Sequence, residues 1–528
     1  MKPINHSRPC PPSDRKERGS TLAKTLSACA LLFCVTPAVS AAEADQRPDD
    51  QIVFAVERAL MFDSAVKAEA IDLLFDDGVV TLNGSVDTLL NYERAAKIAR
   101  QIRGVTSVVN RLEVLPSSLR DRQIRTDVRD ALLFDPATES YEIEVFVKES
   151  HVTLEGKVSS WQEKQLAEHE VKGVRGVVSL DNNLFVAYPL DRADAEILAD
   201  AKRFLATDIW TDHDFIDVEV DDGEVFLSGS VGSAAAADRA QTLVWTTGVK
   251  SVNTENLTVE PWLDVTDKRN RPVDMPDPKI RDAIVRALAV DPRVYSFDPH
   301  VTVDRGVVTL TGVVDNLKAK KAAEQDALNT VGVRRVENLL KVRSDQSDVE
   351  TLTESRIAAS LARNSITDGY DINVAVDGGV VTLRGTVDSA LEKSEAEDVA
   401  QRARGVYLVR NQLEVDYPAF AFYNYAYDPF WSYMPYYIGH SSSESSQLLT
   451  VDARPLDSDR IIRERVQSEL FWSPFVDSDD VSVRVEDATV TLTGTVEDFA
   501  EQSTAIENAY EGGAKLVIND LIIIPPSN

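Results

Sequence analysis

The feature that most constrains this chain is one apolar pattern that occurs six times along its 528 residues. The stretch from Ile71 to Val86 reads IDLLFDDGVVTLNGSV, and the stretch from Ile216 to Val231 reads IDVEVDDGEVFLSGSV. A repeat of this kind indicates one small unit that folds several times. The remaining copies begin at Ile143, Val301, Ile372 and Val481.

The pattern predicts a β-hairpin. Apolar residues alternate with polar residues on both sides of a turn, as in a strand pair with one buried face. At the turn, Asp77-Gly78 and Asp222-Gly223 supply the positive φ that a tight primed turn demands. A glycine also recurs inside the second strand, where it has a cost, so we expect a helix backbone to approach it closely. These glycines are Gly84, Gly156, Gly229, Gly312, Gly385 and Gly494.

Helical patterns flank each hairpin. Val53, Val56 and Leu60 repeat at helical spacing before the first hairpin, and Asp63 stands where that helix would end. After the hairpin, a polar residue such as Asp87 introduces an alanine-rich second helix. A Gly-Val pair and a last strand that contains an asparagine follow. The unit therefore reads αββαβ, an α+β fold in which two helices pack on one face of a three-stranded mixed sheet.

This succession of helix, Asp-Gly hairpin, alanine-rich helix and Gly-Val strand resembles the BON domain. The resemblance covers residues 46–260, 277–416 and 456–524; Ser150-His151 and Asp487-Ala488 depart from the usual turn glycine. The family includes small osmotically inducible periplasmic proteins with two copies. Membership implies association with phospholipid membranes or envelope components, usually without catalysis, and it defines no binding residues by motif.

Six tandem modules are therefore predicted. A proline-containing linker at 261–276 suggests two groups of modules, and an aromatic, serine-rich linker occupies 417–455. The predicted modules, called module one to module six below, are residues 46–115, 119–188, 191–260, 277–343, 348–416 and 456–524.

The N-terminus predicts export to the periplasm. Residues 1–41 combine basic residues, an apolar run from Leu26 to Val35 that is too short to span a bilayer, and small residues after it. Leu26 to Cys29 resembles a lipoprotein box, but Lys24 precedes it and the apolar run follows it, which disfavours a lipoprotein. All three cysteines lie in this segment, so the exported chain would have no thiol.

Charge and motifs exclude several functions. The net charge of −31 argues against nucleic-acid binding, which needs basic surface, and weakens long-range attraction to anionic lipid. The histidines after the signal are scattered singly, and no metalloprotease, hydrolase, Walker or dinucleotide motif occurs. We therefore expect no enzymatic activity and neither a cofactor nor a metal.

Two sets of residues are candidates for contact with a membrane, an envelope polymer or a partner. The first set is basic and belongs to modules one and four: Arg94, Lys97, Arg100, Arg103, Lys318, Lys320, Lys321, Arg334 and Arg335. These residues either bind anionic groups or are solvated and paired with acidic neighbours of the same chain.

The second set is the aromatic part of segment 417–440. It contains Tyr423, Tyr425, Tyr427, Phe430, Trp431, Tyr433, Tyr436 and Tyr437. Three interpretations stay open: the segment folds over the groove between modules five and six, inserts at a membrane interface, or contacts a protein or glycan.

The leading functional hypothesis is a non-catalytic periplasmic protein that binds a phospholipid membrane or envelope components during osmotic or envelope stress. Several weak sites on one chain bind usefully through avidity where the geometry permits simultaneous contact. The alternative is a periplasmic chaperone or scaffold for envelope proteins, whose acidity provides solubility. Neither the oligomeric state nor the relative orientation of the modules follows from the sequence.

Overall fold

The computed structural model describes residues 49–63, 66, 68–139, 141–188, 192–260, 263, 275–294, 297–343, 350–416 and 458–524. Three predicted segments lie outside these residues: the export signal at 1–41, the aromatic linker at 417–455, and most of the linker at 261–276. The described part consists of repeated α+β modules, which confirms the predicted fold class.

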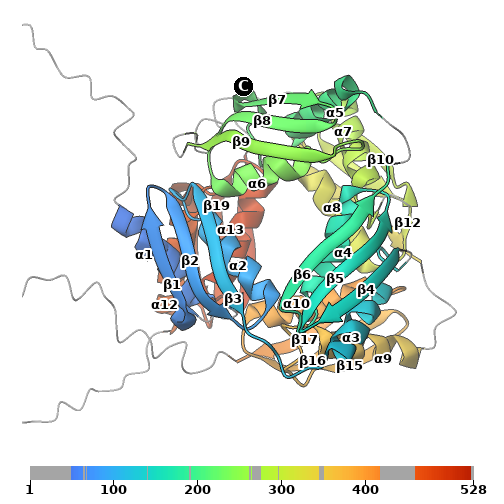
Figure 1. Cartoon of the computed structure of the whole chain (residues 1–528). Helices are drawn as coiled ribbons and strands as arrows, with labels where there is room; N and C mark the ends of the chain where they lie inside the picture. The colour runs from blue at the N-terminus through green and yellow to red at the C-terminus, as the bar shows by residue number, and fades with distance from the viewer. Residues whose placement is uncertain are drawn as a thin grey trace, which may run out of the picture. The chain divides into compact units, whose positions relative to one another are not determined.

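Module one shows the common plan. It runs in the order α1 (Asp49–Phe62), β1 (Ile71–Asp76), β2 (Val79–Val86), α2 (Leu89–Arg100) and β3 (Ser107–Val114). Strand β1 pairs antiparallel with β2, and β2 pairs parallel with β3, so the second hairpin strand is the centre of a mixed sheet. Each sheet carries its two helices on one face (Figure 1).

The other modules repeat this order. Module two contains α3 (Asp121–Phe134), β4 (Glu142–Lys148), β5 (His151–Val158), α4 (Trp161–Lys172) and β6 (Ser179–Val186). Module three contains α5 (Asp194–Thr207), β7 (Ile216–Asp221), β8 (Glu224–Val231), α6 (Ala234–Leu243) and β9 (Ser251–Val259). Module four contains α7 (Asp277–Val290), β10 (His300–Asp304), β11 (Val307–Thr311), β12 (Val313–Val314), α8 (Leu317–Leu328), β13 (Arg335–Asn338) and β14 (Lys341–Val342). Module five contains α9 (Glu350–Arg363), β15 (Asn373–Asp377), β16 (Val380–Val387), α10 (Ala390–Arg402) and β17 (Leu408–Val415). Module six contains α12 (Ser458–Trp472), β18 (Val481–Glu486), β19 (Thr489–Val496), α13 (Phe499–Glu511) and β20 (Leu516–Ile523).

Each module has its own hydrophobic core. In module one, Val56, Leu82 and Ala99 are fully buried between the helices and the sheet. Burial of one such valine or leucine contributes about 1.5–3 kcal/mol. The cores also take residues from other modules: Phe134 of module two lies in the core of module five, and Leu89 of module one lies in the core of module two. The modules therefore stabilise one another.

The hairpin turns have the primed geometry that the sequence predicts. Asp77 and Gly78 have φ values of +46° and +79°. Module two keeps the same turn without glycine, because the carboxylate of Asp121 at the start of α3 accepts hydrogen bonds from the amides of Ser150 (3.0 Å) and Glu149 (2.9 Å). These two donors lower the pKa of Asp121. The first helix thus holds the turn in place.

The glycine of the second strand has a different neighbour from the expected one. A Cβ atom on Gly84 would clash with the carbonyl oxygen of Ala70, and one on Gly494 would clash with that of Asp480. Ala70 and Asp480 end one-turn 3-10 helices that directly precede the first strand. In modules one and six, close backbone approach is therefore the reason for the glycine, but the backbone belongs to this short turn and not to an α-helix.

The second helix begins one residue later than the sequence indicates. Thr88, and not Asp87, caps α2, and its hydroxyl accepts a hydrogen bond from the amide of Asn91 at 3.1 Å. A cap of this kind contributes about 1 kcal/mol. The asparagine of the last strand then ties strand to helix, since the Asn110 side chain donates to the carbonyl oxygen of Tyr92 at 2.7 Å.

Among the described residues from Asp49 onward, the modules contact each other in three pairs. In each pair, the residues that end the first helix of one module bond to the backbone that follows the second helix of the other. The pairs are modules one and six (Arg103 N to Trp472 O, 2.9 Å), two and five (Arg175 N to Arg363 O, 2.9 Å), and three and four (Val331 N to Thr207 O, 2.9 Å). The chain thus pairs its first module with its last and continues inward.

A second set of contacts joins the second helices. Glu93 of module one pairs with Lys172 of module two, and Asp238 of module three pairs with Arg100 of module one at 3.2 Å. Modules two and three meet through the stacked indole rings of Trp161 and Trp245, whose centroids are 5.0 Å apart. Modules one, two and three therefore contact one another in a closed cycle. Modules four and five meet in the same way through Lys318 and Asp398.

Candidate functional site

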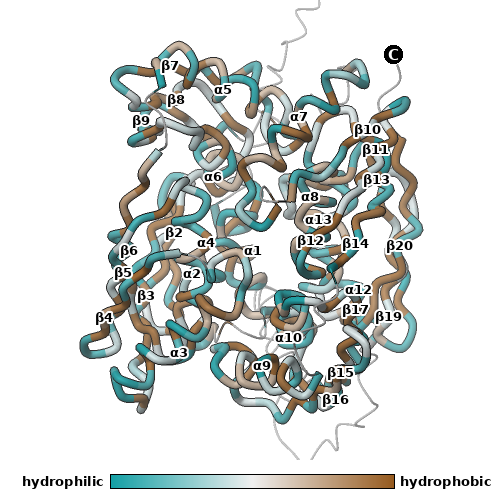
Figure 2. The backbone as a smooth tube through the Cα atoms, turned by 90° about the vertical axis from the view of Figure 1, so that its right-hand side faces the viewer, coloured by the Kyte–Doolittle hydropathy of each residue, from teal (hydrophilic) through white to brown (hydrophobic). Residues whose placement is uncertain are grey.

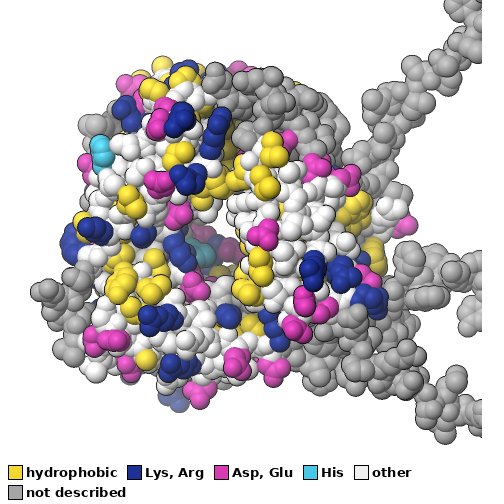
Figure 3. Space-filling model, turned by 180° about the vertical axis from the view of Figure 1, so that it is seen from behind, with side chains coloured by type: hydrophobic (Ala, Val, Ile, Leu, Met, Phe, Trp, Pro, Cys, Tyr) yellow, Lys and Arg dark blue, Asp and Glu magenta, His cyan; other side chains and the backbone are white. Residues whose placement is uncertain are grey.

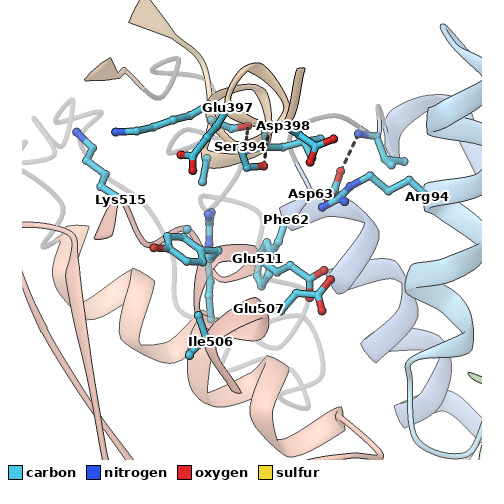
Figure 4. A pocket seen from close by; sticks show the side chains of 18 of the residues that line it. Phe62, Asp63, Arg94, Ser394, Glu397, Asp398, Ile506, Glu507, Glu511 and Lys515 are labelled. Carbon is cyan, nitrogen blue, oxygen red and sulfur yellow. Dashed lines mark hydrogen bonds and ion pairs between the residues drawn. The ribbon is translucent and has the colours of Figure 1, made fainter. Parts of the chain in front are cut away.

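A cavity of about 1460 Å³ lies among residues of modules one, four, five and six (Figure 4). Its polar lining is balanced in charge. The acidic side chains are Glu57, Asp63, Glu69, Glu397, Asp398, Glu464, Glu507 and Glu511, and the basic ones are Arg58, Arg94, Arg293, Lys318, Lys321, Lys393, Arg465 and Lys515. A cavity with this lining offers hydrogen-bond partners to both anionic and cationic groups.

Phe62, the last residue of α1, anchors one part of the cavity. The guanidinium groups of Arg465 and Arg58 lie 4.4 Å and 5.0 Å from the centre of its ring, within range of a cation–π interaction. The next residue, Asp63, ends the helix and binds the Arg94 guanidinium at 2.5 Å. The end of α1 therefore fixes an aromatic ring and three cations in one place.

Carboxyl groups of module six line the cavity beside Phe62 and Arg94. In Figure 4, Glu507 and Glu511 extend from α13 toward the same space as Phe62. Burial, together with the nearby Glu507 and Glu469, raises the pKa of Glu511 to about 8. Burial also raises the pKa of Glu469 to about 7. The raised pKa favours the neutral form of the Glu511 carboxyl, and a protonated carboxyl can donate a hydrogen bond.

The rim of the cavity is apolar. Phe54, Met61, Tyr510 and Leu516 line the cavity and are also exposed large side chains, with Met61 58% exposed. Exposed apolar groups beside polar groups are typical of a surface that contacts an amphiphilic molecule.

The structure brings several of the predicted basic residues together. Arg94, Lys318 and Lys321 line the cavity although they come from modules one and four. Lys318 and Lys321 pair with Asp398 and Glu397 of module five, the latter at 3.2 Å. These cations therefore meet acidic groups of the same chain, and their contact with a membrane stays a prediction.

The remaining predicted cations lie elsewhere. Lys97 binds Glu507 at 2.9 Å, Arg100 binds Asp238, and Arg103 donates to the carbonyl oxygen of Ser473 at 2.8 Å, so all three contact other modules. Arg335 pairs with Glu337 in its own module. Lys320 and Arg334 do not line the cavity. The aromatic candidates from Tyr423 to Tyr437 lie outside the described residues.

Sequence reasoning missed the cavity residues Phe62, Arg465 and Glu511. One signal was available: the copies, when aligned, place an aromatic residue at the end of the first helix in modules one, two and six. Two of these aromatics, Phe134 and Trp472, pack against the core of the paired module. An aromatic at this position therefore marks a contact between modules.

Module two brings one histidine next to other polar groups. The Nδ1 and Nε2 atoms of His151 lie 2.5 Å from Ser179 Oγ and 2.8 Å from Asp181 Oδ2. The parallel register of β5 and β6 puts Ser179 opposite His151, and Asp181 is two residues further along β6 on the same face. Cross-strand pairs of this kind contribute about 0.2–1 kcal/mol to the sheet.

The described ranges contain neither a membrane-spanning helix nor a cluster of metal-ligand side chains. No helix there is long and apolar enough to cross a membrane. No group of three or more His, Cys, Asp or Glu side chains in these ranges is placed to hold a metal ion.

The chain matches the BON domain family at residues 48–116, 120–188, 193–261, 276–344, 350–417 and 458–525. It is 32% identical over 199 residues to osmotically-inducible protein Y of Escherichia coli (strain K12), a match that covers 36% of this chain and 92% of that protein. A solved structure of CdsD, a structural protein of the type III secretion system of Chlamydia trachomatis, is 14% identical and covers 39% of this chain and 91% of its own, with a TM-score of 0.12. A TM-score this low supports no conclusion.

Proposed function

Because the chain belongs to the BON domain family, which it matches in six successive modules, we propose that it is a non-catalytic periplasmic protein that binds phospholipid during osmotic or envelope stress. The name of the similar Escherichia coli protein, which describes it as osmotically inducible, supports the stress context. The predicted export signal at 1–41 supports the periplasmic location.

The lining of the cavity favours a zwitterionic phospholipid headgroup as the ligand. A zwitterionic headgroup has a phosphate and an amine, and the cavity offers guanidinium groups for the first and carboxylates for the second. Arg465 and Arg58 beside Phe62 suit the phosphate, because a planar guanidinium binds phosphate oxygens with paired hydrogen bonds. The acyl chains would leave over the apolar rim that contains Phe54 and Met61.

The charge distribution favours this ligand over a polyanionic envelope polymer. The cavity has as many carboxylates as cations, and the whole chain has a net charge of −31. On the face seen in Figure 3, basic and acidic side chains are interspersed. A polyanion would meet repulsion along such a surface, whereas one zwitterionic headgroup meets both signs of charge at close range.

The test is co-sedimentation of the chain lacking residues 1–41 with vesicles of phosphatidylethanolamine and phosphatidylglycerol. Met61→Asp at the rim is expected to weaken binding about tenfold, because it puts a charge where the acyl chains pass. Leu74→Asp is the matched control, since Leu74 is 64% exposed on β1 and does not line the cavity. Absence of binding to any vesicle, or equal loss from both variants, would contradict the proposal.

A further inference from the structure

The last strand of module six exposes a row of aliphatic side chains. Leu516, Ile518, Ile522 and Ile524 are 53%, 43%, 62% and 55% exposed. They alternate along and just beyond β20, so all four lie on the solvent side of the sheet. Figure 2 shows hydrophobic colour along this strand.

The row distinguishes module six from the other modules. Because the last strand of each module pairs in parallel with the middle strand, equivalent positions follow from the register. Leu516, Ile518, Ile522 and Ile524 correspond to Ser107, Val109, Glu113 and Leu115 in module one and to Leu408, Arg410, Glu414 and Asp416 in module five. Among the described last strands, only β20 has an aliphatic residue at all four positions. The scaffold therefore does not require the row.

The position of β20 leaves backbone groups available. The strand order is β18-β19-β20, so β20 is an edge strand of its sheet. Half of the N–H and C=O groups of an edge strand point away from the sheet and form a template for another strand. Beside the row, on β19, lie Thr489, Thr491 and Thr495, opposite Leu516, Ile518 and Ile522, so the nearest neighbours of these three aliphatic side chains on β19 are uncharged.

We propose that β20 binds an extended segment of another protein as a fourth strand of this sheet. Backbone hydrogen bonds to the free edge would provide affinity, and the aliphatic row would select a segment with alternating apolar residues. Asp520, which is exposed in the middle of the row, selects a lysine or arginine opposite it. The partner is therefore a β-strand sequence with alternating apolar residues and a central basic residue, such as a strand of a β-rich protein that has not yet folded.

Charge argues against a second copy of this chain as the partner. Antiparallel pairing of two β20 strands about their common centre would align Leu516 with Ile524 and Asp520 with Asp520 of the other copy. Like charges directly opposite each other destabilise a strand pair. Exposed Arg484 and Glu486 on β18 of the same sheet likewise disfavour burial of this face in a membrane.

The experiment measures binding of a fluorescent synthetic peptide that alternates valine and threonine around a central lysine. The chain lacking residues 1–41 is expected to bind it, and Ile518→Lys with Ile522→Lys is expected to weaken binding at least about tenfold. Leu408→Lys at the equivalent edge of module five is the matched control and should leave binding unchanged. A peptide N-methylated on alternate residues should not bind, because it lacks the backbone donors.

Two further measurements keep the proposal falsifiable. Asp520→Lys should reverse the preference from the lysine peptide to a peptide with a central glutamate, and hydrogen exchange should slow at β20 amides when the peptide is bound. The proposal is overturned if the peptide does not bind, or if the N-methylated peptide binds equally well. It is also overturned if substitution of Ile518 and Ile522 weakens vesicle binding but leaves peptide binding unchanged. Since Met61→Asp should leave peptide binding intact, failure here is distinguishable from failure of the phospholipid proposal.

Discussion

The contact between modules two and five and the contact between modules one and six use equivalent backbone segments but different polar groups. Between modules two and five, the buried guanidinium of Arg402 donates to both carboxylate oxygens of Glu170 (2.5 and 2.6 Å) and to Asp398 (2.7 Å). Between modules one and six, burial dominates the environment of Glu469 and Glu511; Arg58 is the strongest charged neighbour of Glu469, and Glu507 is the strongest charged neighbour of Glu511.

The two interfaces therefore differ in how their buried ionisable groups are accommodated. Burial disfavours the charge of Arg402, but Glu170 and Asp398 outweigh burial and raise its pKa. Burial also raises the pKa of Glu170, against the attraction of Arg402, but the two short hydrogen bonds from the guanidinium to the Glu170 carboxylate are the geometry of an ion pair. In the other interface, burial raises the pKa values of Glu469 and Glu511 to about 7 and about 8, so protonation removes the charge. Equivalent positions in a repeat are thus free to take either solution, and the choice sets how each interface responds to mutation and to pH.

Of the substitutions at these two interfaces, Arg402→Met is expected to lower the free energy of unfolding most. It leaves Glu170 buried without its partner, and such a loss costs about 3–5 kcal/mol. The free energy of unfolding is measured by urea titration, with hydrogen exchange to locate the loss in modules two and five. Arg402→Met combined with Glu170→Met should recover most of the stability, because no uncompensated charge remains. If the single variant is as stable as the parent, the ion pair is not the organising group of this interface.

The contact between modules one and six should make the free energy of unfolding depend on pH. This effect should be smaller than the loss caused by Arg402→Met. The folded pKa of Glu511 lies above its usual value, so the bound proton stabilises the fold fully below about pH 4.5, and this stabilisation is lost as the pH rises through about 8. Glu511→Gln keeps a neutral group at every pH. Its free energy of unfolding should therefore increase relative to that of the parent as the pH rises from 5 to 8.5. We expect a gain of about 1–2 kcal/mol, since solvent still reaches part of the side chain.

Thermal unfolding at both pH values measures this gain. Glu486→Gln, at a side chain that is 75% exposed on β18, is the matched control. A stability difference between parent and Glu511→Gln that stays constant from pH 5 to pH 8.5 would show that Glu511 is ionised throughout.

Lys97→Met is expected to lower the free energy of unfolding least. Lys97 and Glu507 join modules one and six at 2.9 Å, but about half of each side chain is exposed. Exposed pairs contribute about 0.2–1 kcal/mol and weaken with salt. Unfolding at low and high salt should therefore separate Lys97→Met from Arg402→Met, whose effect should persist in salt. A loss for Lys97→Met as large as that for Arg402→Met would remove the distinction between the two interfaces.

The interior of each module could be predicted from the sequence, because local patterns determine it. The turn at Asp77-Gly78, the alternating strands and the helical spacing of Val53, Val56 and Leu60 depend on neighbours within one copy. The departures were small, such as the cap at Thr88 in place of Asp87. Agreement between local preference and packing is what a repeated module requires.

The pairing of modules could not be predicted, because the shared pattern is the same in every copy. Glu170 and Arg402 are 232 positions apart, and neither differs visibly from a solvated helical residue in the sequence. Lys318 appeared in a basic helix, yet its partner Asp398 belongs to the next module. The cavity follows from this pairing, so its residues were recognisable only once the modules had been placed together.

The pairing of the first module with the last has a consequence for biosynthesis. Arg103 and Ser473, which bond across this pair, are 370 positions apart, and Trp472 covers part of the core of module one. Until module six is in place, the part of the module-one core that Trp472 covers stays exposed. Long-lived, half-assembled chains of this kind are prone to aggregation. The contact between modules one and six joins segments far apart in sequence, and contacts of this kind form slowly.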